Sequence, residues 1–312
     1  MRRFLGLATC VLSFAYLIFV LNTIQMLSVV FYPFSRKTMR EINRWCARSI
    51  WGLWVIMAEV QNGIEIRIKG DEIPPRENAL LLPNHQTMAD VMVLICFAWR
   101  CGRVGDLKFF VKEVMKYVPG PGWGMRFLDC IFVKRDWERD KDGILRLFSK
   151  YKAESIPVFL VSFLEGTRRT PVKHAAAQAF AEDRGLYVPK HTLVPRTKGF
   201  VATMQGLRSH LDAVYVLTIG YPGRIPTLLN CYEAKVERVE LHLRRYPIAE
   251  LPEAEAELSK WVFERFEELD RRLEELAATG AITGPSRDSK VNALDWFRSE
   301  KRWTDRERPA NH

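Results

Sequence analysis

The chain has 312 residues, with 47 Lys and Arg against 37 Asp and Glu, so its formal net charge is +10. Apolar residues make up 48% and charged residues 27%, a composition that excludes a disordered protein, a collagen-like fibre and a polytopic membrane transporter. The length suits one large domain or two small ones. Six cysteines occur without a Cys-x-x-Cys pair, which argues against a disulfide framework or a zinc knuckle and favours a reducing compartment.

The first thirty-five residues have the pattern of a membrane anchor. No charged residue occurs from Phe4 to Ser35. A helix over residues 4–30 would be about 40 Å long, whereas the hydrocarbon core of a bilayer is about 30 Å thick. The apolar stretch is longer than that of a cleaved signal peptide. We therefore expect a retained helix that spans the membrane or lies deep in it.

A basic cluster and a second apolar stretch follow. Five of the six charged residues from 36 to 48 are Lys or Arg, which predicts contact with an anionic membrane and places the body on its cytoplasmic face, at a bacterial inner membrane or the endoplasmic reticulum. Residues 50–58 are apolar but too few to span a bilayer. They suit an interfacial helix and a soluble core helix equally well.

The body alternates strand and helix patterns, which is typical of an α/β sheet flanked by helices. The predicted strands are 64–68, 79–82, 130–133, 157–163, 213–220 and 236–243, and the predicted helices are 91–98, 143–151 and 253–277. Residues 108–124 interleave lysines with aromatic residues before a Pro-Gly-rich turn. Here an interfacial element and a core helix followed by an ordinary turn are both expected.

These patterns divide the chain into three parts. Residues 1–60 form the membrane anchor, 61–250 the main domain, and 251–312 an amphipathic helix with a polar tail.

A histidine and an aspartate follow the predicted strand 79–82. On one regular helix His85 and Asp90 would be about 140° apart. They can meet if His85 lies in a turn and Asp90 in the first turn of the next helix. Asp90 would then orient a catalytic imidazole, or it would only complete a capping box with Thr87 as the helix N-cap. Both interpretations remain open.

The sequence lacks several other catalytic signatures. It contains no Gly-x-Ser-x-Gly motif, so a hydroxyl activated by His85 would belong to the substrate. It also lacks His-Glu-x-x-His, a Cys/His cluster and a Walker A motif, so neither a metal site nor nucleotide hydrolysis is expected.

Two basic turns also follow predicted strands. Glu165-Gly166-Thr167-Arg168 offers backbone N–H groups, a hydroxyl and a forked cation, which suit a phosphate group. Lys134 and Arg135 follow strand 130–133 in the same way. Since ligand sites of α/β sheets form at strand ends, a site shared with His85 is expected.

Four ordered motifs between residues 60 and 225 resemble those of the glycerolipid acyltransferases, most of all the 1-acyl-sn-glycerol-3-phosphate acyltransferases. The motifs are Asn84-His85-x4-Asp90, Val133–Arg135, Glu165-Gly166-Thr167-Arg168 and Leu193–Phe200. The runs 134–140 and 195–199 resemble the eukaryotic-type branch, which includes lysocardiolipin acyltransferases. Leu164 stands where many members have proline, and residues 252–312 are polar and acidic where that branch commonly has membrane helices. Both departures leave the acceptor within the family open.

The resemblance implies a mixed β-sheet flanked by helices and a direct transfer without an acyl-enzyme. The acyl chain would pass from acyl-CoA or acyl-carrier protein to the sn-2 hydroxyl of 1-acylglycerol-3-phosphate, giving phosphatidate. His85 would be the general base, and Asp90 would orient it. The residues implied for substrate binding are Asn84, Lys134, Arg135, Glu165, Gly166, Thr167, Arg168 and Pro195. No metal, cofactor or nucleic acid is expected as a partner.

Three alternatives stand beside this hypothesis. The acceptor could be another lysophospholipid, such as lysocardiolipin or lysophosphatidylinositol. The chain could be a thioesterase that releases the thiol without an acceptor. Or it could be a non-enzymatic protein that binds anionic membranes or nucleic acid, in which Asp90 only caps a helix.

Overall fold

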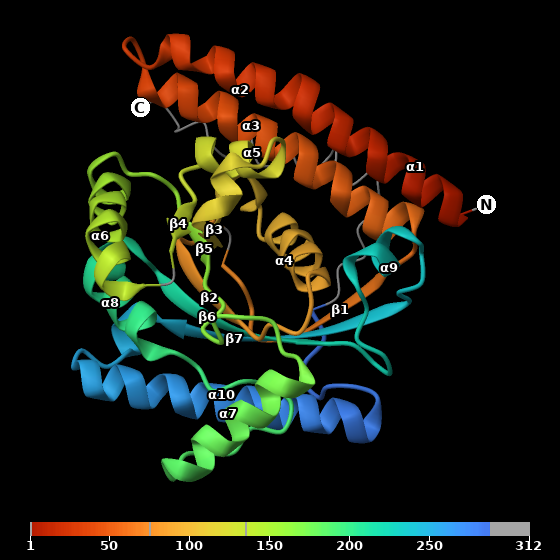
Figure 1. Ribbon diagram of the computed structural model, residues 1–312, viewed down its shortest axis with the longest axis vertical. Coiled ribbons are helices and arrows are strands. Elements are labelled where there is room, and N and C mark those ends of the chain that lie inside the picture. Colours follow the sequence, from red (N-terminus) through yellow and green to blue (C-terminus); the bar gives the residue numbers. More distant parts are fainter. Residues whose placement is uncertain (1, 75, 135, 288–312) are drawn as a thin grey trace, which may run out of the picture.

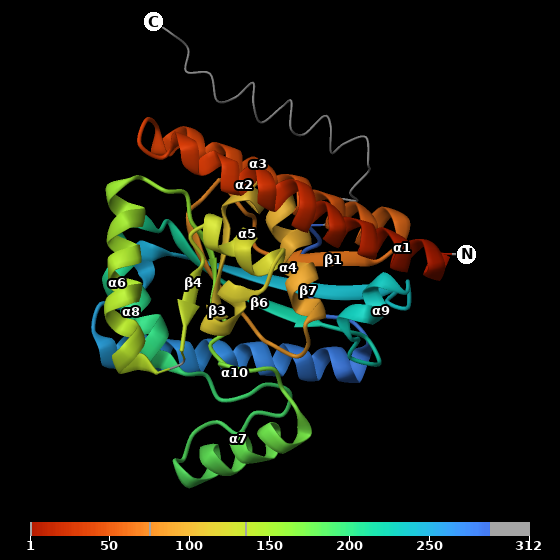
Figure 2. The same cartoon turned by 45° about the horizontal axis from the view of Figure 1, so that its top comes forward.

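The computed structural model describes residues 2–74, 76–134 and 136–287. In this part of the chain a seven-stranded sheet with the order β1-β7-β6-β2-β5-β3-β4 lies between two layers of helices (Figures 1 and 2). The expected mixed α/β sheet flanked by helices is confirmed.

The strand directions decide where the ends of the strands meet. The strands are β1 (Glu65–Gly70), β2 (Ala79–Pro83), β3 (Leu107–Lys112), β4 (Ile131–Val133), β5 (Phe159–Val161), β6 (Ala213–Gly220) and β7 (Arg238–Pro247). β6 and β7 are antiparallel, and the other neighbouring pairs are parallel. Therefore β2 to β6 all run in one direction, and their carboxyl ends lie at one edge of the sheet.

The helices confirm the three predicted in the body and add several short ones. The chain is helical from Arg2 to Phe31 through α1 (Arg2–Ala15), the π-helical η1 (Tyr16–Leu21), α2 (Asn22–Ser28) and the 3-10 turn η2 (Val29–Phe31). The other helices are α3 (Arg36–Val55), η3 (Ile56–Gln61), α4 (Ala89–Arg100), η4 (Val104–Asp106), η5 (Glu113–Tyr117), α5 (Pro121–Phe127), α6 (Trp137–Ala153), α7 (Pro171–Asp183), α8 (Thr197–Leu207), η6 (Arg208–His210), α9 (Leu228–Tyr232), η7 (Ile248–Glu250) and α10 (Glu255–Thr279).

Strand β3 corrects the prediction for residues 108–124. The first part of this segment belongs to β3, a strand between β5 and β4, rather than to a core helix or an interfacial element. The sequence did not predict this strand, because a lysine is not expected at a buried strand position. The side chain of Lys108 is nevertheless buried, and its Nζ donates to the backbone oxygen of Leu128 at 2.8 Å. Burial lowers the pKa of this lysine. The second half contains η5, where Val114 and Tyr117 are exposed, and α5.

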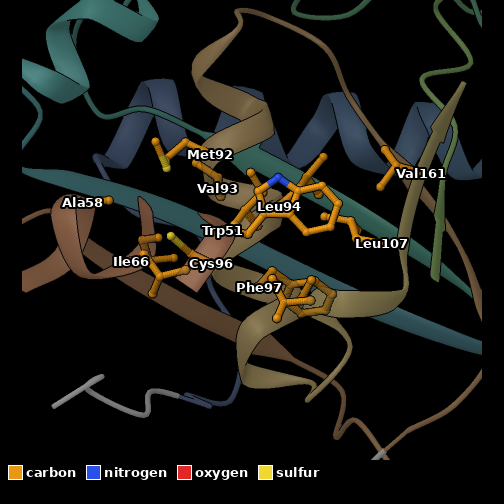
Figure 3. Close-up of a cluster of buried hydrophobic side chains, with 14 of the residues drawn as sticks. Trp51, Ala58, Ile66, Met92, Val93, Leu94, Cys96, Phe97, Leu107 and Val161 are labelled. Atoms are coloured by element: carbon orange, nitrogen blue, oxygen red, sulfur yellow. The ribbon is translucent and has the colours of Figure 1, made fainter. Parts of the chain in front are cut away.

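Each face of the sheet has its own apolar core, because successive side chains of a strand point to opposite faces. Ala79 and Leu81 of β2 belong to the core under α3 and α4. Figure 3 shows part of that core, where Trp51 of α3 and Phe97 of α4 lie among strand residues. Leu80 and Leu82 belong to the opposite core, which α6, α8 and α10 cover.

Both cores bear on expectations from the sequence. Most of residues 50–58 are buried against the sheet, so the core-helix interpretation of this stretch is confirmed. The division at residues 60 and 250 stays a prediction. Helices from all three predicted parts nevertheless pack on the one sheet.

The N-terminal helix buries several polar side chains and exposes many of its apolar ones, although Leu17 and Leu21 are buried. Ser13, Asn22 and Ser28 are buried, with the Ser13 hydroxyl accepting from Trp54 Nε1 at 3.1 Å and Asn22 Oδ1 accepting from the backbone N–H of Gly120 at 2.9 Å. The large exposed side chains include Phe4, Leu12, Phe19 and Val30. This pattern is the reverse of a surface helix in water. By length and composition, Arg3–Phe31 is apolar enough to cross a membrane.

Part of the basic cluster on α3 faces the body. Arg36 and Arg40 both pair with Glu154, and Arg44 Nε lies 2.6 Å from Asp106 Oδ1. These ion pairs hold α3 to the sheet layer. Much of the positive charge counted between residues 36 and 48 is therefore compensated within the protein.

Candidate active site

The turn between β2 and α4 brings His85 and Asp90 together. The imidazole Nδ1 of His85 lies 3.0 Å from Oδ2 of Asp90, whose side chain is fully buried. A carboxylate so placed accepts the Nδ1–H, which leaves Nε2 as the basic nitrogen of the ring. This is the arrangement that a catalytic pair requires. Its five-residue spacing is bridged because only Asp90 lies in the helix.

Asp90 also caps the turn. Its Oδ2 accepts the backbone N–H of Gln86 at 2.7 Å and of Thr87 at 2.9 Å. Asp90 therefore both contacts the imidazole and holds the turn, but the expected capping box with Thr87 as the N-cap is wrong. Thr87 is not the N-cap that we expected, since α4 begins one residue later, after Met88. The Thr87 hydroxyl donates instead to the backbone oxygen of Pro226 at 2.6 Å.

Phe163, just beyond β5, fixes the plane of the imidazole. The two ring centroids are 3.9 Å apart and the planes differ by 24°. The side chain of His85 is 12% exposed. Among the residues that the structure describes, Nε2 has no hydrogen-bond partner. It is therefore oriented and available to take a proton from a substrate.

Tyr221 is a site residue that the sequence analysis missed. It follows β6, and its hydroxyl donates to Oδ1 of Asp90 at 2.7 Å. Burial, with the neighbouring Asp90 carboxylate, raises the pKa of this phenol well above its ordinary value. Each oxygen of Asp90 therefore has a donor, and Oδ2 stays turned toward His85. The position of Tyr221 at the end of a predicted strand was the one available signal.

Asn84 anchors the turn to strand β6 through two hydrogen bonds. Its side chain has no exposed surface, its Nδ2 donates to the backbone oxygen of Ile219 at 2.9 Å, and its Oδ1 accepts the N–H of the same residue at 2.7 Å. Direct contact with substrate, the role implied by the resemblance, does not fit a side chain with both polar atoms used in this way. Asn84 instead joins the end of β2 to β6.

Glu165 links three segments. Its Oε1 accepts the backbone N–H of His85 at 2.6 Å, and its Oε2 accepts that of Leu193 at 2.9 Å. Burial raises the pKa of this carboxyl to about 8, although the two N–H groups act in the opposite direction. Since the side chain is buried, Glu165 positions the His85 backbone, and the expected contact with substrate does not fit.

The turn formed by residues 165–169, called here the Gly166 turn, carries cations at the same edge. Gly166 has φ 68°, a conformation that favours glycine. A Cβ at this position would lie 3.2 Å from the Arg196 side chain, so the exposed Arg196 lies directly over the turn. Arg168 is also exposed, and Lys173 Nζ donates to the Thr167 hydroxyl at 2.6 Å. Two arginines and a hydroxyl suit a phosphate group.

Comparison of the sequence with known proteins identifies the family of this chain. Residues 65–221 match the family model described as Acyltransferase, and residues 227–297 match the model described as Acyltransferase C-terminus. The chain belongs to the acyltransferase family. It is 31% identical over 271 residues to the probable 1-acyl-sn-glycerol-3-phosphate acyltransferase 5 of Arabidopsis thaliana, covering 86% of this chain and 72% of the relative.

Two further comparisons agree with this membership. The chain is 32% identical over 305 residues to 1-acyl-sn-glycerol-3-phosphate acyltransferase delta of Bos taurus, covering 92% of this chain and 80% of the relative. Its fold is similar to the crystal structure of the 1-acyl-sn-glycerophosphate (LPA) acyltransferase PlsC from Thermotoga maritima. That similarity has a TM-score of 0.54 and 19% identity, and it covers 89% of this chain and 98% of the other.

The structure places the remaining predicted residues differently. Lys134, at the end of β4, is two strands away from β5, and its side chain approaches Glu113 at 3.9 Å rather than the Gly166 turn. Pro195 is buried beside Arg196. Arg135 lies outside the described residues. Leu164, where many family members have proline, is buried in the core under α8, and its backbone oxygen accepts the N–H of Arg196 at 2.8 Å.

Proposed function

We propose that this acyltransferase transfers an acyl chain from acyl-CoA or acyl-carrier protein to the sn-2 hydroxyl of 1-acylglycerol-3-phosphate, giving phosphatidate. The observation that carries the proposal is the oriented His85–Asp90 pair beside an arginine-bearing turn at one sheet edge. The names of the relatives support this choice of acceptor.

The proposed mechanism needs one base and no covalent intermediate with the enzyme. Nε2 of His85 takes the proton of the acceptor hydroxyl while the oxygen of that hydroxyl attacks the thioester carbonyl. The new C–O bond forms, the C–S bond breaks, and the thiolate leaves with the proton that His85 held. Asp90 stabilises the imidazolium between these two transfers. Arg168 and Arg196, with the Thr167 hydroxyl, would bind the phosphate of the acceptor.

The N-terminal helix would give the site access to a lipid substrate. We propose that Arg3–Phe31 lies along one leaflet on the cytoplasmic face, with its exposed apolar side chains among the acyl chains. The antiparallel α3 supports this placement. Asn43 and Trp54 of α3 donate hydrogen bonds to side chains of the N-terminal helix, and α3 also packs on the sheet. A single-chain lipid could then reach His85 without leaving the membrane surface.

Purified protein tests the reaction. With acyl-CoA and lysophosphatidate it should form phosphatidate, and His85→Ala should lower kcat by about 10²–10⁴ because general-base catalysis is lost. A parallel panel with lysocardiolipin and lysophosphatidylinositol, compared by kcat/KM, identifies the acceptor. Thiol release without any acceptor would indicate a thioesterase. An unchanged rate in a folded His85→Ala variant would contradict the mechanism.

A further inference from the structure

Asp270 of α10 is a buried carboxylate that accepts five hydrogen bonds from one loop. Its Oδ1 accepts the backbone N–H groups of His191 and Thr192, each at 2.8 Å, and the Thr192 hydroxyl at 2.9 Å. Its Oδ2 accepts the N–H of Lys190 at 2.8 Å and the Tyr187 hydroxyl at 3.0 Å. Five donors more than fill the roughly four lone-pair sites of a carboxylate. All of them come from residues 184–196, called here the 184–196 loop.

This loop depends on Asp270 for its position. It joins α7 to α8 without regular structure of its own. From α7, Gln178 Nε2 and His174 Nε2 donate to the backbone oxygen of Pro189 at 2.9 and 3.1 Å. This helix is itself weakly packed, because Ala181 is its one buried side chain, and Figure 2 shows α7 beyond α10, away from the sheet. An open groove of about 440 Å³ separates part of the loop from α10, with Tyr187 and Phe263 among its walls. Hydrogen bonds therefore hold the loop along this groove, together with the packing of its buried residues Thr192 and Leu193.

The loop in turn holds the catalytic turn. Directly after Thr192, the N–H of Leu193 donates to Oε2 of Glu165 at 2.9 Å, and Oε1 of Glu165 accepts the N–H of His85 at 2.6 Å. The N–H of Arg169 returns to the backbone oxygen of His85 at 2.9 Å. The hydrogen bonds of Asp270, the peptide bond between Thr192 and Leu193, and the hydrogen bonds of Glu165 thus connect α10 to the backbone of the proposed general base.

We infer that Asp270 is a positioning residue of the active site, holding the 184–196 loop so that Glu165 can place His85. The inference rests on the proposed function for its effect on turnover. It also gives the C-terminal family segment, residues 227–297, a direct part in building a site whose other residues all precede it in the chain.

Asp270→Asn, with Glu274→Gln as the matched control, tests the inference. Asn replaces one acceptor oxygen by a donor that faces backbone N–H groups, whereas Glu274→Gln removes only a surface ion pair to Lys190 of the same loop. We expect kcat to fall by about tenfold to a hundredfold in Asp270→Asn, since a small misplacement of catalytic groups has effects of this size. KM for both substrates should change less than twofold. Glu274→Gln should keep the wild-type kcat.

Backbone hydrogen exchange gives a second readout that needs no turnover. In Asp270→Asn, peptides covering residues 84–90 and 190–196 should exchange faster than in the wild type, and Glu274→Gln should not change them. A lower melting temperature with unchanged kcat and unchanged exchange at 84–90 would overturn the inference. If wild-type protein proves inactive in acyl transfer, the proposed function fails, and the exchange data still decide the role of Asp270.

A milder variant covers the case in which Asp270→Asn does not fold. Thr192→Val removes one donor hydroxyl and keeps the shape of the side chain. It should lower kcat severalfold and speed exchange at 84–90. In combination with Glu165→Gln, the losses should be less than multiplicative, because both residues act through the same backbone. Fully multiplicative losses would show that the two residues act independently and would contradict the inference.

Discussion

At the scale of single residues, the candidate site is held mainly by buried groups whose polar atoms are paired within the protein. Asp90 has donors on both oxygens, Glu165 accepts two backbone N–H groups, and Asn84 is paired with Ile219. Nε2 of His85 and the exposed side chains of Arg168 and Arg196 remain accessible to a ligand. The chemistry therefore rests on a few accessible groups within a buried polar frame.

Tyr221→Phe tests this frame beside Asp90. The change removes the hydroxyl that donates to Oδ1 and leaves the ring in place. A hydrogen bond to a charged acceptor contributes about 1.5–3 kcal/mol, so kcat should fall by about tenfold to a hundredfold while KM changes little. Tyr246→Phe, which removes a longer bond to Glu268 near the surface, is the control and should keep the wild-type rate. Equal kcat in the two variants would argue against a role for Tyr221.

Glu165 should make stability depend on pH. Its pKa is raised from 4.5 to about 8 in the folded state, so the folded chain holds a proton that the unfolded chain has released. Stability should therefore fall as the pH rises from about 4.5 to about 8 and then level off. Glu165→Gln lacks this titration and should lose less stability over that range. Urea unfolding in detergent at pH 5.5 and 8.5 measures the difference, and parallel losses would contradict the assignment.

The residues that the sequence revealed are those with local partners. His85 and Asp90 are five positions apart and follow a clear strand, so their meeting could be foreseen. Tyr221 lies 131 positions beyond Asp90, and only the pairing of β2 with β6 brings them together. Asp270 is distant in the same way, 78 to 83 positions beyond the residues that it binds. Side chains that reach across the fold leave no local pattern.

At the scale of elements, glycines decide how closely the outer helices approach the body. A Cβ on Gly6 of α1 would lie 2.0 Å from the backbone oxygen of Tyr232 in α9. α9 in turn follows the segment whose Pro226 accepts the Thr87 hydroxyl. The contact therefore links the N-terminal helix to the neighbourhood of His85. This contact could not be predicted from the sequence, because Gly6 is one residue of an apolar stretch.

Gly6→Ala and Gly143→Ala should have opposite effects on stability. In α1 the added methyl group would push α9 away, which should lower the melting temperature in detergent by several degrees. In the exposed part of α6, the nearest atom to a Cβ on Gly143 is 4.0 Å away. Alanine there should stabilise the helix by about 0.5–1 kcal/mol. If Gly6→Ala raised the melting temperature as well, the close approach of α1 to α9 would be refuted.

At the scale of the whole molecule, the apolar N-terminal helix and α7 lie on opposite sides of the sheet (Figure 2). The protein therefore has one side suited to lipid, while its other side carries an exposed, weakly packed helix. The sequence predicted a membrane segment here from its composition, and the structure shows a helix that is long and apolar enough to cross a membrane. Its placement along the body depends on polar side chains of α3 and on a backbone N–H group of the turn before α5, which composition alone does not reveal.

Spin labels can distinguish a helix along one leaflet from one that spans the bilayer. Labels at Phe4, Leu12, Phe19 and Val30, all exposed, would be introduced one at a time into an active cysteine-free background and reconstituted in vesicles. We expect similar depths at all four positions by power saturation, and a label at Ala176 of α7 should remain in water. Depths that peak near Leu12 and Phe19 and reach opposite headgroups at the ends would show a spanning helix.

The sheet order has a consequence for how the chain is made. β1 lies at the edge of the sheet beside β7, and residues 65–70 pair with residues 238–243. During synthesis, β1 therefore leaves the ribosome long before its partner strand exists. The apolar helix Arg3–Phe31, by contrast, precedes every strand in the chain and can reach a bilayer before the sheet forms. Contacts of such long range are formed late, so this chain should meet the membrane while its sheet is still incomplete.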